Sequence, residues 1–346
     1  MRNWNYPLTL SLSKGEPVEG RGRPAGLVEI IPLIAIFPKM SQTPSYGDFI
    51  LPFDIPRAGV RGRLVRLDAA ATRALSAHVL PEEAARVTGE ALALSAILGS
   101  ALKLDGRLTM QTKSDGPLDL VTVDYYGASE EKPRGVRAFG RLDKDRFAAR
   151  TEKNFAALAG QGALAITIEP RLGGNTYQGI VALSPEGIAP SAETYFAQSE
   201  QLPTAIRLAA APLFVAGDRG PHWRSGGLML QMTPQAAPEA APEAAITSDD
   251  WERLSLILRT VEDLELVDTA LAPETLLWRL FHEDEVRVHP SEPIVFRCDC
   301  DGARIARILK GYSPEEREGL ADDDGIIRAS CEFCGTVHAI GPEALA

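Results

Sequence analysis

All four cysteines of this chain lie within its last fifty residues, and no other feature of the sequence restricts the fold as strongly. They form two close pairs, Cys298-Asp299-Cys300 and Cys331-Glu332-Phe333-Cys334, separated by thirty residues. Two such pairs of thiolates suit one tetrahedral zinc ion, which binds sulfur at about 2.3 Å. The second pair has the ordinary C-x-x-C spacing of a zinc knuckle, whereas C-x-C is one residue tighter. We therefore expect one Zn²⁺ per chain, bound in the reduced protein by Cys298, Cys300, Cys331 and Cys334.

The spacing leaves two roles open for this site. Zinc holds each sulfur as a thiolate, the form that reacts with oxidants, and each cysteine has a partner close in sequence. An oxidant could form two local disulfides, Cys298–Cys300 and Cys331–Cys334, and expel the metal. The alternative is a permanently reduced zinc ribbon. The spacing alone does not decide between a redox switch and a structural staple.

Composition restricts the compartment and the partners. The chain of 346 residues has room for two or three domains, and its 45% apolar residues exclude wholesale disorder. Its 36 basic and 47 acidic residues leave a net charge of −11, which argues against nucleic acid or an anionic membrane as the main partner. Because the cysteines form one metal-like cluster rather than a disulfide framework, we expect a reducing, cytoplasmic location.

The first 47 residues are expected to lie outside the folded domains. The apolar stretch 27–37 is interrupted by Pro32, and it is shorter than the roughly 20 residues that cross a bilayer. It also lacks the basic flank and the cleavage site of a signal peptide. We interpret residues 1–39 as disordered, or as sequence upstream of a true start at Met40.

Residues 48–233 are predicted to form an N-terminal domain with a mixed α/β sheet. Alternating or apolar runs bounded by turn residues predict strands, and two segments have helical periodicity. The expected strands are 60–67, 108–112, 118–125, 165–169, 177–183 and 228–232, and the expected helices are 81–104 and 192–199.

No catalytic motif occurs in this chain, so we do not expect an enzyme. The sequence has no G-x-S-x-G, P-loop or H-E-x-x-H, and no strand is predicted before Gly160-Gln161-Gly162. The histidines are scattered along the chain. His338 is nearest to the cysteines, but four thiolates already fill a tetrahedron.

A Pro/Ala/Glu-rich linker at 234–246 separates this domain from a helical region at 247–292. The first expected helix has a cap at 247–250 and an apolar stripe, and the second begins at Pro273. The stripes consist of Trp251, Leu254, Leu258, Val261 and Leu264, and of Leu276, Leu277, Leu280 and Phe281. This pattern is typical of a helical hairpin packed on the first domain, or of a detachable element whose apolar face becomes a binding surface.

Residues 293–346 are predicted to form a small C-terminal module around the cysteines. We expect strands at 294–297, 326–328 and 336–340, a helix at 303–310, and a second helix that begins with the capping box at 313–316. Its six basic and ten acidic residues give a balance of −4, unlike a nucleic-acid-binding ribbon. Few apolar residues support this module, so the metal should supply most of its stability, about 10–16 kcal/mol for a structural zinc.

Together these motifs resemble the 33 kDa chaperonin family of bacterial redox-regulated heat-shock holdases. The resemblance rests on C-x-C…C-x-x-C with CEFCG, and on YQGIVAL (177–183), SEQLPT (199–204), GGLMLQ (226–231) and LLWRLFHEDEV (276–286). It covers residues 48–340. It implies an α+β fold: an N-terminal mixed α/β sheet domain, an amphipathic helical linker and a small C-terminal zinc-binding redox module.

The resemblance also implies how such a protein acts. The reduced, zinc-bound form is inactive, and oxidation pairs Cys298 with Cys300 and Cys331 with Cys334, releases zinc and exposes apolar surface. The active form, often a homodimer, binds unfolding or oxidatively damaged proteins without ATP. A zinc-ribbon adaptor with a purely structural metal is the alternative. The N-terminal extension and the Pro/Ala/Glu insert depart from the family pattern, but neither touches the cysteines.

Overall fold

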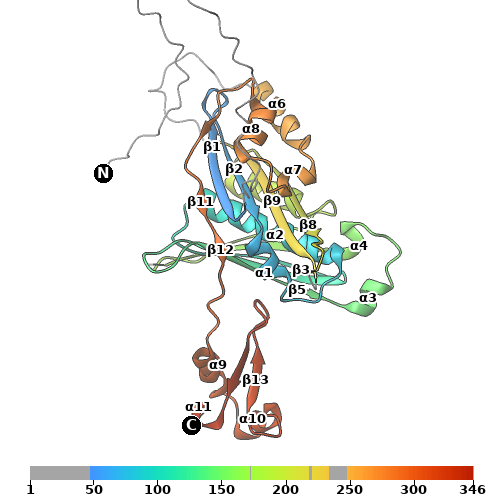
Figure 1. Cartoon of the computed structure of the whole chain (residues 1–346), viewed down its shortest axis with the longest axis vertical. Coiled ribbons are helices and arrows are strands. Elements are labelled where there is room, and N and C mark those ends of the chain that lie inside the picture. The colour runs from blue at the N-terminus through green and yellow to red at the C-terminus, as the bar shows by residue number, and fades with distance from the viewer. Residues whose placement is uncertain (1–46, 172, 218–219, 234–247, 346) are drawn as a thin grey trace, which may run out of the picture. The chain divides into compact units, whose positions relative to one another are not determined.

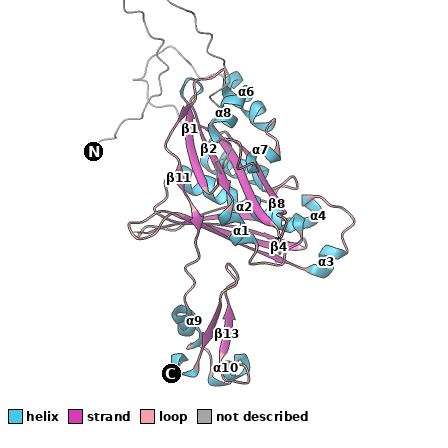
Figure 2. Ribbon diagram, viewed as in Figure 1, coloured by secondary structure: helices cyan, strands magenta, loops and turns pink. Residues whose placement is uncertain are grey.

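The computed structural model describes residues 47–171, 173–217, 220–233 and 248–345. The expected N-terminal extension up to Tyr46, the Pro/Ala/Glu linker at 234–246 and the cap residue Thr247 lie outside the described residues. The elements are arranged as two large sheets, helices on their faces and a small C-terminal module, as Figures 1 and 2 show.

Sheet A is antiparallel, and its central strands are long and almost fully buried. Its strands are β1 (Phe49–Ile55), β2 (Val60–Leu67), β9 (His222–Met232) and β8 (Thr204–Leu213) in that order, with β10 (Arg287–Val288) and β11 (Glu292–Pro293) both paired to β1. Seven of the eight residues of β2 are buried. A strand that is buried on both faces needs a cover on each side of the sheet.

Sheet B faces the same central helix from the other side. Its order is β12 (Val295–Phe296), β5 (Gly135–Leu142), β4 (Leu118–Tyr126), β3 (Gly106–Ser114), β6 (Gly162–Pro170) and β7 (Tyr177–Ala182). Only the β12–β5 pair is parallel. The chain between Arg287 and Phe296 is therefore paired first with the edge of sheet A and then with the edge of sheet B.

Helix α2 (Glu82–Ala101) is the common cover of both sheets, and the larger core surrounds it. Leu92, Ile97, Val65 and Val123 all have less than 1% exposed surface in this core. Gly99 allows the close approach, since a Cβ at that position would lie 2.1 Å from Tyr125 Cδ1. Shorter helices surround this core: α1 (Ala69–Leu75), α3 (Lys144–Ala148), α4 (Phe155–Ala159) and α5 (Ile188–Tyr195), and a π-helix (Phe196–Glu200) follows α5.

Three linker helices cover the other face of sheet A (Figure 1). They are α6 (Ser248–Arg259), α7 (Asp263–Val267) and α8 (Pro273–Phe281). Their apolar stripes and the strand residues below them form a second core, which includes Leu254, Leu258, Leu276 and Phe281. The rings of Phe281 and Phe53 stack at 6.2 Å between centroids. The helical region is therefore packed on the first domain in this structure.

The C-terminal module has a very small apolar core. It contains α9 (Gly302–Leu309), α10 (Pro314–Leu320), α11 (Pro342–Leu345) and the hairpin of β13 (Ile327–Ser330) and β14 (Val337–Ile340). Its buried cluster consists of four side chains, those of Ala306, Leu309, Ile327 and Ile340. The predicted capping box before α10 is confirmed, because the Ser313 hydroxyl accepts from the Glu316 amide and the Glu316 carboxylate accepts from the Ser313 amide.

The α+β fold class is confirmed, but several elements differ from the prediction. Helix α2 ends at Ala101 rather than at residue 104, because Lys103 has a left-handed φ of 49°. Pro81 is its N-cap and not its first residue. The strand predicted at 294–297 is shorter in the structure, where only β12 (Val295–Phe296) pairs with β5, because the preceding residues pair with β1 as β11. Strands β1, β5 and β8 were not predicted.

The predicted stripe of the first linker helix is wrong at its last position. Leu254, Leu258 and Val261 are buried as expected, but Leu264 is 70% exposed. Helix α6 ends at Arg259 and α7 begins at Asp263, so the helical period does not continue to residue 264. Among the described helices, none has the length and apolar character needed to cross a lipid bilayer.

Phe281→Ala should loosen the linker helices on sheet A, whereas Trp278→Ala on the same helix should not. Phe281 has no exposed surface and Trp278 is 67% exposed. Removing a buried phenylalanine costs about 3–5 kcal/mol, whereas exposed substitutions stay within about 0.5 kcal/mol. Amide exchange of α6 and α8 in the reduced protein measures the difference. Equal protection in both variants would contradict this packing.

Candidate metal centre

The four cysteines lie on two loops of the C-terminal module. Cys298 and Cys300 lie between β12 and α9, and Cys331 and Cys334 lie in the turn that joins β13 to β14. The second loop is a tight knuckle, in which the Gly335 amide donates to the Cys331 carbonyl at 2.8 Å and Gly335 has a φ of 70°. The glycine after the C-x-x-C pair therefore permits the turn that points both sulfurs inward.

The two loops bring all four sulfurs together. The four Sγ atoms lie within 4.8 Å of one another, with Cys298 and Cys331 at 3.7 Å and Cys300 and Cys334 at 3.5 Å. Sulfurs bound at about 2.3 Å around a tetrahedral zinc would lie about 3.8 Å apart. The cysteines are free thiols, and three of them are half-buried. The arrangement is compatible with one zinc ion. Among the residues that the structure describes, the group that could hold this ion consists of the four cysteines and does not include His338.

The surroundings of the four sulfurs shift the pKa values of the cysteine thiols in different directions. Burial raises the pKa of Cys298 and of Cys300, and neighbouring thiols raise both further. Burial also acts on Cys334, but hydrogen bonds with Thr336 and with the thiols of Cys300 and Cys331 outweigh it and lower its pKa to about 6. Four sulfurs this close together can all be thiolates at neutral pH only when a cation shares the site.

One arginine of sheet B contacts both cysteine loops. Arg137 Nη1 lies 3.5 Å from Cys298 Sγ, and its guanidinium lies 3.9 Å from the centroid of the Phe333 ring. Arg137 is held in place by Asp124, a fully buried carboxylate that accepts from its Nε at 2.6 Å and also from Arg107. Arg137 and Phe333 thus join the module to the sheet. The sequence contains no signal for Arg137, because an arginine within a strand does not reveal its distant partner.

Comparison with known proteins places this chain in a family. The family model described as Hsp33 protein matches residues 48–340, which include both sheets, the linker helices and all four cysteines. The chain belongs to the Hsp33 family. Membership supports a chaperone role.

Individual relatives agree with this result. A 33 kDa chaperonin from Caulobacter vibrioides is 37% identical over 299 residues, which are 85% of this chain and 95% of that protein. One from Escherichia coli is 32% identical over 277 residues, 80% of this chain and 86% of that protein. The crystal structure of a 33 kDa chaperonin from Thermotoga maritima has a TM-score of 0.67 at 21% identity, and covers 86% of this chain and 96% of that one. This last likeness shows the fold.

Phe333→Ala should weaken the attachment of the C-terminal module to sheet B and leave the four sulfur ligands in place. A desolvated cation–π contact such as that between Phe333 and Arg137 contributes about 0.5–2 kcal/mol. We expect faster amide exchange at Val295 and Arg297, whose N–H groups donate to main-chain carbonyls at the edge of sheet B. NMR exchange rates measure this effect.

Glu332→Ala is the matched control, because Glu332 is exposed and also lies between the two cysteines of the knuckle. It should leave those rates unchanged. If Phe333→Ala exchanged no faster than this control, the ring would not be holding the module.

Proposed function

We propose that this chain is a redox-regulated, ATP-independent holdase chaperone of the cytoplasm. The observation that carries the proposal is the group of four free thiols, all within 4.8 Å, in a chain that matches the Hsp33 family from 48 to 340. In the reduced state, Cys298, Cys300, Cys331 and Cys334 bind one Zn²⁺ and the protein is inactive. Its partners are unfolding or oxidatively damaged proteins, and the activated form is a homodimer. Nucleic acid and membranes are not expected as partners.

The small core of the C-terminal module explains why metal binding would control its folding. Four buried apolar side chains cannot stabilise a module of this size alone. A structural zinc site contributes about 10–16 kcal/mol, so loss of the thiolate ligands would unfold the module. A disulfide between residues two or three positions apart closes too small a loop to compensate.

The redox step balances with hydrogen peroxide as the oxidant. The two thiolates of a pair form one S–S bond and lose two electrons, which peroxide accepts with two protons to give two molecules of water. Oxidation of both pairs uses two peroxide molecules and leaves no thiolate for the metal. Sulfurs of different pairs also lie 3.5–3.7 Å apart, so proximity alone does not select Cys298–Cys300 and Cys331–Cys334. The likeness to the family supports that pairing.

Unfolding of the module would reach the linker helices through the strands between them. Residues 287–296 pair with β1 and with β5, so they connect the cysteine loops to both sheets. When this segment loses its anchor, α6–α8 lose support and the apolar outer face of sheet A opens. An exposed apolar surface of this kind is what an unfolding protein binds.

The first test concerns the metal. The reduced protein should contain one zinc per chain, and Cys331→Ser should lose most of the binding and loosen residues 298–340. Metal analysis and amide exchange measure the two effects. Full affinity in Cys331→Ser, or no zinc in the wild type, would contradict the assignment.

The second test concerns the switch and distinguishes it from a zinc-ribbon adaptor. Peroxide with mild heat should turn the protein into a suppressor of aggregation of a thermally unfolding client, peroxide alone should do so less, and the reduced form should be inactive. We expect the Cys331–Cys334 bond to form first, because it closes the larger and less strained ring. Disulfide mapping by mass spectrometry follows the order. Equal activity of the reduced and oxidised forms would favour the adaptor.

A further inference from the structure

A buried arginine of sheet A holds the middle linker helix. Arg66 lies on β2, is 1% exposed and faces the linker helices. Its Nε donates to the Leu266 carbonyl at 3.1 Å, its Nη2 to the Glu265 carbonyl at 2.9 Å, and its Nη1 to the Leu271 carbonyl. One guanidinium thus joins the C-terminal end of α7 to the loop that leads into α8.

These carbonyls need an external donor. The last carbonyls of a helix have no partner within it, and a cation near them is favourable. Helix α7 has only five residues, and isolated helices shorter than about 12 residues are marginal in water. Its position therefore depends on contacts with the sheet.

The strand next to Arg66 is shaped for the same contact. Gly226 on β9 is directly opposite Arg66 in the sheet. A Cβ at Gly226 would lie 2.4 Å from the Leu266 carbonyl oxygen, the same atom that accepts from Arg66. Arg66 and Gly226 together form the surface on which the end of α7 packs, and a larger residue at position 226 would prevent this close approach.

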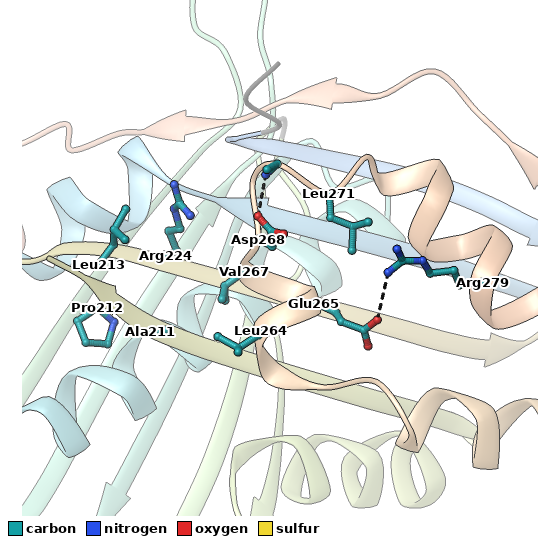
Figure 3. Close-up of a pocket in the computed structure, with 11 residues that line it drawn as sticks. Ala211, Pro212, Leu213, Arg224, Leu264, Glu265, Val267, Asp268, Leu271 and Arg279 are labelled. Atoms are coloured by element: carbon teal, nitrogen blue, oxygen red, sulfur yellow. Dashed lines mark hydrogen bonds and ion pairs between the residues drawn. The ribbon is translucent and has the colours of Figure 1, made fainter. Parts of the chain in front are cut away.

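Apolar packing does not fully hold α7 on its outer side. A groove of about 580 Å³ lies between α7 and the ends of β8 and β9, lined by Leu213, Leu264 and Leu271 among others (Figure 3). Across this groove, Arg279 of α8 reaches Glu265 at 3.7 Å. Two side chains of α7 are buried, Leu266 and Val267, and at the start of the helix Asp263 accepts a hydrogen bond from Arg207 of β8 at 2.9 Å.

The charge of Arg66 has an energetic cost in the closed state. Burial lowers its pKa to about 10, although Asp268 and Glu274 attract the charge. Lifting α7 would hydrate the guanidinium and recover this cost, at the loss of three hydrogen bonds. The hydrogen bonds of Arg66 are thus strong while α7 is packed on sheet A, and they are weak once water reaches the guanidinium.

From this geometry we infer that Arg66, seated opposite Gly226, is the positioning residue that holds α7 on sheet A and sets how readily the linker helices open. The consequence for chaperone activity rests on the proposed function, but the contact itself does not. Opening can be measured in the reduced protein, without any client.

The experiment measures amide exchange over residues 263–271 in the reduced, zinc-loaded full chain. Arg66→Met keeps the length of the side chain and removes its donors, and we expect exchange about 10 to 100 times faster. Hydrogen bonds from a charged donor contribute about 1.5–3 kcal/mol, and about 1.4 kcal/mol is a tenfold change. Arg66→Lys keeps the charge but cannot reach three carbonyls, so its effect should be smaller. Gly226→Ala should accelerate amide exchange in the same segment. This variant tests the contact between β9 and α7 independently if Arg66→Met does not fold.

Arg61→Met is the matched control, because Arg61 lies on the same strand and bonds Gln231 instead of the linker. It should leave residues 263–271 unchanged, and protection of β3 and β4 should be equal in all variants. Unchanged exchange at 263–271 in the Arg66 variants, or an equal rise in sheet B, would overturn the inference.

A second readout separates this inference from the proposed function. After peroxide treatment, Arg66→Met should suppress client aggregation at a lower temperature than the wild type does. If no oxidised variant, wild type included, suppresses aggregation, the proposed function fails while the exchange data still decide the role of Arg66. If wild type switches and Arg66→Met has the same onset temperature, the role of Arg66 in setting that temperature is wrong.

Discussion

The burial of sheet A on both faces is the constraint on which the rest of the structure depends. Along β2, Val65 and Leu67 belong to the core around α2, whereas Leu64 belongs to the core under the linker helices. Antiparallel sheets commonly leave one face to water, but this one cannot without exposing a large apolar surface. Helix α2 forms one cover as an integral part of the domain. The second cover, α6–α8, follows the domain in sequence and leads directly to the cysteines.

The two covers differ in what stabilises them. Helix α2 is a single element of 20 residues enclosed between two sheets. The second cover consists of three shorter helices, the middle one of only five residues, and it continues into a module with four buried apolar side chains. Stability in a protein is uneven, and segments with few buried contacts open first. If the sulfurs are oxidised as we propose, the change acts where the described residues have the smallest apolar core, rather than at α2 in its place between the two sheets.

The features that follow from local patterns were predictable, and those that depend on distant partners were not. Ligand spacing predicts that the sulfurs converge, and helical periodicity predicts the burial of Leu254 and Leu258. The same periodicity fails at Leu264, because it cannot foresee that α6 ends at Arg259. Arg66 and Arg137 lie in strands, where an arginine is normally expected to face solvent. Their partners in the linker region and in the cysteine loops are 161 to 205 residues away, so only the folded chain reveals them.

Polar contacts explain how the linker helices α6–α8 can have a defined position on sheet A although little free energy holds them there. Apolar packing alone tolerates sliding, since one aliphatic contact can replace another, whereas the carbonyls of α7 fit the guanidinium of Arg66 in a single position. Burying that charge offsets part of what its hydrogen bonds contribute, so the net gain from closure is smaller than the number of contacts suggests. If α7 opens as we propose, water would solvate both the arginine and the carbonyls, and the apolar face of sheet A beside them would lose its partner. If the cover opens as we propose, it would leave an apolar surface with a charged residue of an interior strand, Arg66 of β2, among the uncovered side chains.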